Sequence, residues 1–370
     1  NIDQTRNFNH LHCETYLNKI IAHHGWENLT ARLVPTPMKT DTQYQADIQL
    51  SEGPESLKEQ KQLERTMGFN YRQCIGELIY ALTICRIDIS IAIITLSQHS
   101  LNPARIHYEA VKHLFAYLNA TKRHGLTYWR TSPRLDLPLT QDPTPISQAG
   151  RLDKFDLQYN ALELIGACDA TWASDRKHRR SMGGIVMMLA GAAIYYRTRL
   201  QPTIAQSSTE AEFTNMADAG KAALYLKWIL EELGIIMLAP TPIHADNQGA
   251  IRLANSQQPT RRTRHVEMKH FVILQWTDDK FINFIDTPTD ENYSDSLSKP
   301  TGRTKFYEHT DIFMGRRKPA YTDCIESTDP HSPTKTSIIH YLSLSTYRNN
   351  PIINLLQTNY LDGFDSASAA

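Results

Sequence analysis

The spacing of apolar side chains predicts helices in the first part of the chain. From residue 70 to residue 100, apolar residues recur at i, i+3, i+4 and i+7, although the isoleucines of "RIDISIAII" also alternate as in a strand. Residues 101–125 predict a helix that Asn102 caps, with Pro103 at its first position. We therefore predict a small, mainly helical module over residues 61–130.

Weakly patterned sequence lies on both sides of this module and at the end of the chain. Residues 1–60 are polar and include the proline-set segment "ARLVPTPMKTD", so we expect an extended stretch there. The segment 131–155 begins with many Pro, Thr and Ser residues, which predicts a linker. Residues 316–370 form a tail rich in Ser, Thr and Asn to which we assign no role.

The pattern changes between the linker and the tail, over residues 156–315. Three apolar runs separated by short turns predict consecutive antiparallel strands, and the pattern from residue 207 to Gly234 predicts a long helix that begins at a Ser/Thr cap. Further segments predict a strand at 240–247, a helix at 248–257, a helix ending at 276, a strand at 281–288 and a short helix at 290–299. This order predicts an α/β fold in which one mixed sheet carries helices on its faces.

Composition and charge narrow the function classes only slightly. The 370 residues suggest two or three domains, and 41% apolar with 21% charged residues is typical of globular proteins. Lys plus Arg and Asp plus Glu both total 39, so nucleic-acid binding would depend on local basic patches. The first residue is Asn rather than Met, which leads us to expect a fragment or a processed piece.

Cysteine usage and hydropathy lead us to expect a soluble, intracellular protein that does not bind a membrane. Five cysteines are scattered without a C-x-x-C pair, which favours reduced thiols over disulfides or a zinc site. A signal peptide and the ~20-residue apolar run of a transmembrane helix are both absent from the sequence. We expect a cytoplasmic or nuclear location.

Acidic residues at strand ends and helix starts are the candidate catalytic groups. Asp169 interrupts the apolar run "LIGACDATWA", although acids are rarely buried without a partner or a metal. Asp246 ends a predicted strand, and Asp295 belongs to the last short helix. Carboxylates gathered at one edge of a sheet would repel one another unless cations neutralise them, and oxygen ligands of this kind suit Mg²⁺. An isolated acid is more often a solvated turn residue, and Asp246 alone could cap the following helix.

Two glutamates compete for the position on the long helix. Residues two apart do not share a helix face, so one of Glu210 and Glu212 should reach a common site. Glu210 follows Ser207 by three residues, which is the spacing of a capping box, and this leaves Glu212 as the better ligand. A capping box between Thr209 and Glu212 remains the alternative.

Basic clusters are candidates for contacts with nucleic-acid phosphates. The sequence "RKHRR" supplies Arg176, Lys177, Arg179 and Arg180, and "RRTRH" supplies Arg261, Arg262 and Arg264. A charge run is more often a solvated surface, but the first cluster follows the strand that carries Asp169, which favours a functional role.

In order and spacing, several segments resemble the ribonuclease H domain of copia-type LTR retrotransposon polyproteins. They are "CDATWASDRKHRRSMGGIVMML", "SSTEAEF", "ADNQGAI", "RTRHVEMKHFVI" and "YSDSLSKP". Upstream, "YRQCIGELIYALTICRIDISIAIITLSQHS" resembles the thumb and connection region of the reverse transcriptase of the same family. The resemblance covers roughly residues 10–315.

This resemblance implies a five-stranded mixed sheet of the ribonuclease H type and Mg²⁺-dependent hydrolysis of the RNA strand in RNA–DNA hybrids. It places the metal ligands at Asp169, Glu212, Asp246 and Asp295, around two Mg²⁺ ions for which Mn²⁺ could substitute. Thr171 stands where the family often has a second acid. The paired aspartates of a polymerase site are absent, so we expect no DNA synthesis from this chain; the polymerase palm and fingers of the same polyprotein are an expected partner.

Two further interpretations are compatible with the sequence. The chain could be a catalytically inactive retroelement remnant, or a module that binds and positions a hybrid. An integrase-like nuclease would share the sheet topology, but the "SSTEAE" helix and the thumb-like segment argue against it.

Overall fold

A computed structural model of the chain describes residues 1–4, 8–29, 36–129, 163–235, 237, 239–255 and 267–316. The predicted linker at 131–155, nearly all of the predicted tail at 316–370 and the basic cluster around Arg261 lie outside these residues. The division of the chain into domains therefore stays a prediction.

Residues 1–60 differ from the extended stretch that we expected. They contain strands β1 (Ile2–Gln4) and β2 (Phe8–His12), helices α1 (Glu14–His23) and α2 (Thr42–Leu50), and the start of α3 (Leu57–Met67). The prediction failed because these elements are stabilised by distant partners. Strand β2 pairs with β3 (Gly125–Trp129), which is more than 110 residues away, and α1 and α2 pack against α6 (Arg105–Ala120).

The predicted helical module contains α4 (Tyr71–Ile84), a 3₁₀ turn at Ile87–Ile89, α5 (Ser90–Ser97) and α6. The ambiguous isoleucine segment is therefore helical. Helix α6 begins two residues later than predicted, because the side chain of Asn102 donates to the carbonyl of Gly53 instead of capping the helix. His107 takes over at this end, since its Nδ1 accepts from the Ala104 N–H at 2.8 Å.

Five strands of the described chain form one mixed sheet in the order β6-β5-β4-β7-β8. Strands β4 (Ile165–Thr171), β5 (Met182–Leu189) and β6 (Ala192–Leu200) are antiparallel, whereas β7 (Thr241–Ala245) and β8 (Ile282–Asp286) run parallel to β4. The other elements are α8 (Ser208–Glu232), α9 (Gln248–Asn255), α10 (Glu267–Asp278), α11 (Asp295–Ser298) and α12 (Arg303–Phe313). This is the predicted ribonuclease H-like α/β fold preceded by helices.

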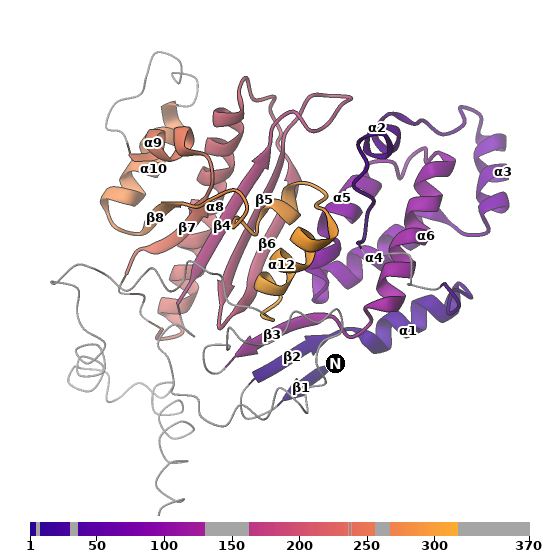
Figure 1. Cartoon of the computed structure of the whole chain (residues 1–370), viewed down its shortest axis with the longest axis horizontal. Helices are drawn as coiled ribbons and strands as arrows, with labels where there is room; N and C mark the ends of the chain where they lie inside the picture. Colours follow the sequence, from indigo (N-terminus) through magenta and orange to yellow (C-terminus); the bar gives the residue numbers. More distant parts are fainter. Residues whose placement is uncertain are drawn as a thin grey trace, which may run out of the picture.

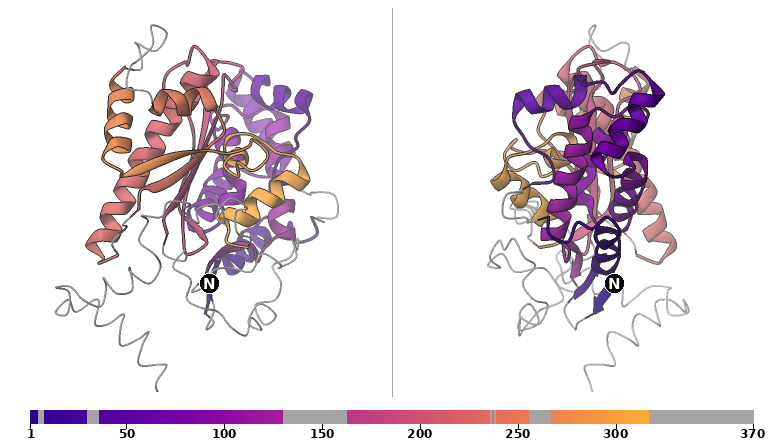
Figure 2. Two further views of the ribbon diagram at one scale, coloured as in Figure 1. Left: turned by 60° about the vertical axis from the view of Figure 1, so that its left-hand side comes forward. Right: turned by 90° about the vertical axis from the view of Figure 1, so that its right-hand side faces the viewer.

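The mixed sheet is covered on both faces, as its strand sequences require. Helices α8, α9 and α10 lie on one side of it, and α12 with the N-terminal helices lies on the other (Figures 1 and 2). In β5, Ile185 and Met187 belong to one hydrophobic core while Val186 and Met188 belong to the other. Strands buried on both faces read as continuous apolar runs, which is the pattern that "GGIVMML" shows.

Two adjacent glycines in β5 allow helices to approach closely on opposite faces. A Cβ atom on Gly183 would lie 2.4 Å from the side chain of Asn215 in α8. A Cβ atom on Gly184 would lie 2.8 Å from the Cβ of Leu297 in α11. Gly184 also pairs with Asp169 across the sheet, so this contact fixes α11 beside the strand that carries the candidate acid.

The N-terminal helices and the mixed sheet share one hydrophobic core. It includes Leu78 of α4 and Leu114 of α6 together with Val186 of β5 and Leu297 of α11. Polar contacts cross the same boundary: the hydroxyl of Tyr196 in β6 donates to the carbonyl of Leu82 at 2.8 Å. Every helix among the described residues is too short or too polar to traverse a bilayer.

The shared core predicts that damage in the N-terminal helices loosens the mixed sheet. Leu78 is fully buried, so Leu78→Ala should lower the free energy of unfolding by about 2–5 kcal/mol. Hydrogen exchange should accelerate at backbone amides of both α4 and β5. The exposed Leu57→Ala is the control and should change stability by less than about 0.5 kcal/mol. Faster exchange confined to the N-terminal helices would contradict a shared core.

Candidate active site

Asp169 lies near the C-terminal end of the central strand β4 and is 2% exposed. The hydroxyl of Ser298 in α11 donates a hydrogen bond to its Oδ2, and the ammonium nitrogen of Lys299 lies 3.8 Å from the same oxygen. The carbonyl of Asp169 accepts from the side-chain amide of Asn215 in α8 at 2.8 Å. Both the helix on one face and the short helix on the other therefore fix this part of the strand.

The start of α8 separates the roles of the two glutamates. Ser207 caps the helix by accepting from the Glu210 N–H at 3.2 Å, and Glu210 turns back to accept from the Gln206 N–H at 2.7 Å. Glu212 is 6% exposed instead, and one of its carboxylate oxygens lies in the group with Asp169 and Asp246. The alternative capping box at Thr209 does not form, because Ser207 is the cap.

Asp246 immediately follows β7, the strand parallel to β4. The next residue, Asn247, accepts from the Ala250 N–H at 2.9 Å and so supplies the side-chain cap for α9. Asp246 is therefore not needed as a helix cap. Capping of α9 does not explain why an acid stands at this position.

Three of the predicted acids converge at the edge where β4 and β7 end. Carboxylate oxygens of Asp169, Glu212 and Asp246 all lie within 4.8 Å of one another. Burial and the nearby charge of Asp295 raise the pKa of Asp169 to about 7. Burial and the charges of Asp169 and Asp246 raise the pKa of Glu212 well above its ordinary range.

The fourth predicted acid, Asp295, lies beside this group and is held by two lysines. Its carboxylate oxygens are 2.9 Å from the ammonium nitrogen of Lys299 and 2.8 Å from that of Lys305 in α12. Burial would raise the pKa of Asp295, but these two charges outweigh it and lower the pKa. Asp295 is thus an ionised carboxylate that lies outside the group of three, and Lys299 connects it to Asp169.

Three residues of the site, Ser298, Lys299 and Lys305, were not predicted from the sequence. The hydroxyl of Thr171 donates to Ser298, which in turn donates to Asp169. Thr171 therefore supports the site at the position where the family often has an acid. The only sequence signal for Lys299 was its i+4 spacing from Asp295, whereas Lys305 belongs to helix α12, which we did not predict.

The donor set fits divalent cations that prefer oxygen. Three carboxylates supply hard ligands, and Oε2 of Glu212 is buried without a hydrogen-bond partner among the described residues. Cations at this position would neutralise charges that otherwise repel one another in a poorly solvated place. Asp169, Glu212 and Asp246 could hold them, whereas Asp295 pairs with Lys299 and Lys305.

The first basic cluster lies in the turn between β4 and β5, directly after the strand of Asp169. Arg176, Lys177, Arg179 and Arg180 are all exposed. Lys177 forms an ion pair with Glu52, and the backbone N–H of Arg176 donates to the side chain of Gln49. The turn is thus fastened to the N-terminal part of the chain while its arginine side chains remain accessible.

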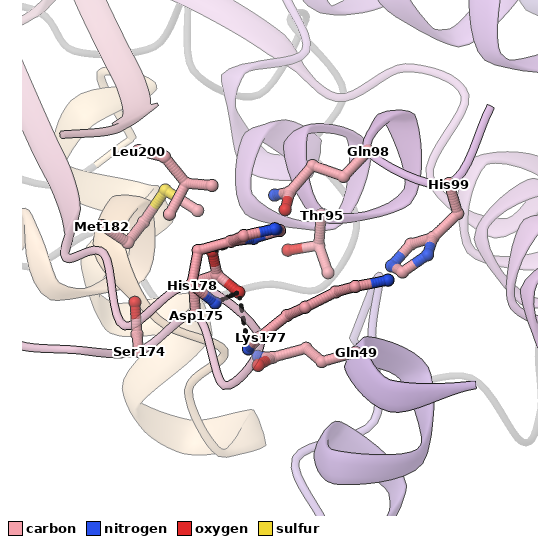
Figure 3. Close-up of a pocket in the computed structure, with 10 residues that line it drawn as sticks. All are labelled: Gln49, Thr95, Gln98, His99, Ser174, Asp175, Lys177, His178, Met182 and Leu200. Atoms are coloured by element: carbon pink, nitrogen blue, oxygen red, sulfur yellow. Dashed lines mark hydrogen bonds and ion pairs between the residues drawn. The ribbon is translucent and has the colours of Figure 1, made fainter. Parts of the chain in front are cut away.

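A pocket of about 150 Å³ lies beside this turn, between α2, α5 and the ends of β5 and β6 (Figure 3). Its described lining includes His99, Lys177 and the ion pair between His178 and Asp175, and it contains none of the four acids. The pocket is therefore separate from the carboxylate group.

The chain is similar in sequence to known proteins. No protein-family model matches the chain. It is 28% identical over 295 residues to the "Retrovirus-related Pol polyprotein from transposon TNT 1-94" of Nicotiana tabacum, which covers 79% of this chain and 19% of the relative. It is also 28% identical over 236 residues to the corresponding polyprotein from transposon RE1 of Arabidopsis thaliana, covering 64% of this chain and 14% of that one.

The chain is similar to retrotransposon Pol polyproteins. This confirms the resemblance that its motifs indicated, and the chain spans less than a fifth of the length of these two relatives. Among solved structures, LC11-RNase H1, isolated from compost by a metagenomic approach, aligns with 36% of this chain and 91% of its own, at 14% identity and a TM-score of 0.29. The strand order β6-β5-β4-β7-β8 is that of a ribonuclease H-like fold.

The raised pKa of Asp169 predicts how the stability of the metal-free chain depends on pH. Between pH 4 and 7 the unfolded chain ionises this carboxyl while the folded chain keeps it protonated, so the free energy of unfolding falls as pH rises. Asp169→Asn should weaken this fall and raise the Tm at pH 8. Each 1 kcal/mol gained corresponds to about 2–4 °C for a domain of 150–250 residues.

Thermal melts in EDTA across this pH range would measure the effect. Asp279→Asn is the control, because Asp279 is exposed after the end of α10, and the variant should leave the pH profile unchanged. Equal slopes for the wild type and Asp169→Asn would mean that Lys299 already keeps Asp169 ionised at low pH.

Proposed function

We propose that this chain hydrolyses the RNA strand of RNA–DNA hybrids by ribonuclease H-type, two-metal catalysis. The observation that carries the proposal is the convergence of Asp169, Glu212 and Asp246 within 4.8 Å at one edge of the mixed sheet. The similarity to Pol polyproteins supports a role in a retroelement, where the polymerase palm and fingers of the same polyprotein would be the partner. A cytoplasmic retroelement particle or the nucleus is the expected location.

The proposed mechanism assigns a separate task to each part of the site. Asp169, Glu212 and Asp246 would hold two Mg²⁺ ions, or Mn²⁺ as a substitute, and Asp295 would complete the ligand set. When bound, such ions lower the pKa of an attacking water and stabilise the charge on the leaving oxygen. The oxygen of the water would bond to phosphorus as the bond between phosphorus and the 3′ oxygen breaks. The 3′ oxygen would take up a proton, which leaves 5′-phosphate and 3′-hydroxyl ends.

The surrounding residues keep the acids in position while substrate binds. Asn215 holds the backbone of Asp169 and Gly184 to α8, through hydrogen bonds of 2.8 and 2.9 Å. Lys299 supplies a positive charge between Asp169 and Asp295, where a phosphate of the substrate would approach. Positions fixed in advance avoid reorganisation during the reaction, which is the main source of electrostatic catalysis.

Cleavage of a labelled RNA–DNA hybrid by the full chain tests the proposal. Asp246→Asn and Glu212→Gln should reduce the rate by at least about 100-fold, a loss similar to removal of one preorganised electrostatic group. Glu210→Gln is the matched control: its side chain caps the helix start, so the rate should stay within about twofold. EDTA should abolish cleavage, and excess Mg²⁺ should restore it.

Well-folded protein that binds a hybrid without cleaving it in Mg²⁺ or Mn²⁺ would favour the positioning module. Absence of both binding and cleavage would favour an inactive remnant. Loss of activity in Glu210→Gln but not in Glu212→Gln would mean that Glu210, and not Glu212, is the metal ligand.

The exposed arginines of the β4–β5 turn should contribute to hybrid binding. Replacing Arg179 and Arg180 with Ala should weaken binding and reduce the slope of log K against log salt by up to about one per lost phosphate contact. Arg105→Ala, an exposed arginine of α6 paired with Glu109, is the control and should leave the slope unchanged. An unchanged slope in the double variant would mean that the arginines of this turn do not contact phosphates of the hybrid.

A further inference from the structure

A second group of metal-ligand side chains lies in the N-terminal helices, away from the four acids of the mixed sheet. His24 follows the last turn of α1, and Cys74 and Glu77 lie one turn apart on the same face of α4. Nε2 of His24 is 3.5 Å from Sγ of Cys74 and 2.7 Å from Oε2 of Glu77. One atom from each side chain lies within 4.8 Å of the other two.

Neighbouring side chains hold two of these donors in place. The ring of His24 stacks on Trp26 with a centroid distance of 4.5 Å and meets the edge of Phe115 at 5.5 Å. Gln73 donates to Oε1 of Glu77 at 3.0 Å, which leaves Oε2 directed at His24. Support of this kind from surrounding groups is typical of metal sites, where outer hydrogen bonds orient the ligands.

The group is enclosed but reachable from solvent. Cys74 is fully buried, whereas the side chains of His24 and Glu77 are 8% and 17% exposed. An ion could therefore enter from the side of His24 and Glu77 and meet the thiol at the bottom of the site.

We propose that His24, Cys74 and Glu77 bind a Zn²⁺ ion that fastens α1 to α4. A sulfur, a nitrogen and an oxygen ligand suit Zn²⁺ and exclude a preference for Mg²⁺. Bond lengths of about 2.0–2.3 Å around a tetrahedral Zn²⁺ place ligand atoms about 3.3–3.7 Å apart. The contact between His24 and Cys74 already has this length, and the contact between His24 and Glu77 would open by about half an ångström.

Binding requires the release of protons. Burial raises the pKa of the Cys74 thiol to about 12, so this group is neutral in the metal-free protein. Zn²⁺ would replace the thiol proton, and Nε2 of His24 would bind as the neutral ring nitrogen instead of hydrogen bonding to Glu77. A solvent molecule would supply the fourth ligand, as in sites with three protein ligands.

Titration of the full chain with Co²⁺, a spectroscopic substitute for Zn²⁺, tests the proposal. Excess Mg²⁺ is kept present so that the oxygen ligands of the acid site are occupied. We expect one equivalent of Co²⁺ to produce a thiolate-to-metal charge-transfer band that Zn²⁺ abolishes. Zn²⁺ should also raise the Tm, because it binds the folded state.

Variants distinguish this site from other thiols and imidazoles. Cys74→Ser should remove the charge-transfer band, and His24→Gln should weaken Co²⁺ binding by more than the roughly 10–100-fold expected for loss of a supporting residue. His178→Gln is the control, since this exposed imidazole pairs with Asp175 in the β4–β5 turn and lies outside the group. Circular dichroism of each variant without metal checks that it is folded. If Cys74→Ser does not fold, His24→Gln still tests the site, because it removes a ligand and leaves the thiol in place.

A band that persists in Cys74→Ser, or binding of Co²⁺ without any thiolate band, would overturn the proposal. Equal losses in His178→Gln and His24→Gln would also overturn it. None of these readouts depends on hybrid cleavage, so the outcome is independent of the proposed nuclease activity.

Discussion

The electrostatic repulsion between three carboxylates held within 4.8 Å of one another is the constraint on which the rest of this site depends. Two of these groups, Asp169 and Glu212, are almost completely buried, so water cannot screen them. Without cations, the pKa values of both groups are raised, so both carboxyls take up protons more readily. Protonation removes their charge and with it the repulsion. Such an arrangement lowers stability, and it persists because the sheet and α8 fix the backbone on which the acids stand.

The supporting structure comes from both faces of the mixed sheet. Asn215 ties α8 to the strands on one face, and Gly184 lets α11 approach on the other. Helix α11 is itself packed between the sheet and α5, because the hydroxyl of Thr198 in β6 bonds to both Ser90 and Leu297. The N-terminal helices therefore help to hold Asp295 beside the other acids, and a fragment limited to residues 156–315 would lose that support.

The two groups of ligands in the chain differ in chemistry and in neighbours. The acid group offers oxygen atoms at a sheet edge, near lysines and an exposed basic turn, as a site for hard cations and phosphates requires. The group at His24 combines sulfur, nitrogen and oxygen between two helices and has aromatic rings around it. The first arrangement suits chemistry on a phosphodiester, whereas the second suits a structural link.

The sequence by itself determined the elements of the mixed sheet and most of the acids that meet at its edge. Periodicity is local, so "LIGACDATWA" predicts a buried strand, and the Ser207–Glu210 spacing separates Glu210 from Glu212 before any contact is known. Only the tertiary structure decided what depends on distant partners. The strands and helices of residues 1–60 form against β3 and α6, and Lys305 reaches Asp295 from a helix that has little sequence signal of its own. Likewise, His24 and Cys74 are 50 residues apart in the sequence. The pattern of apolar residues along a helix predicts which face is buried, but not which other helix packs against that face.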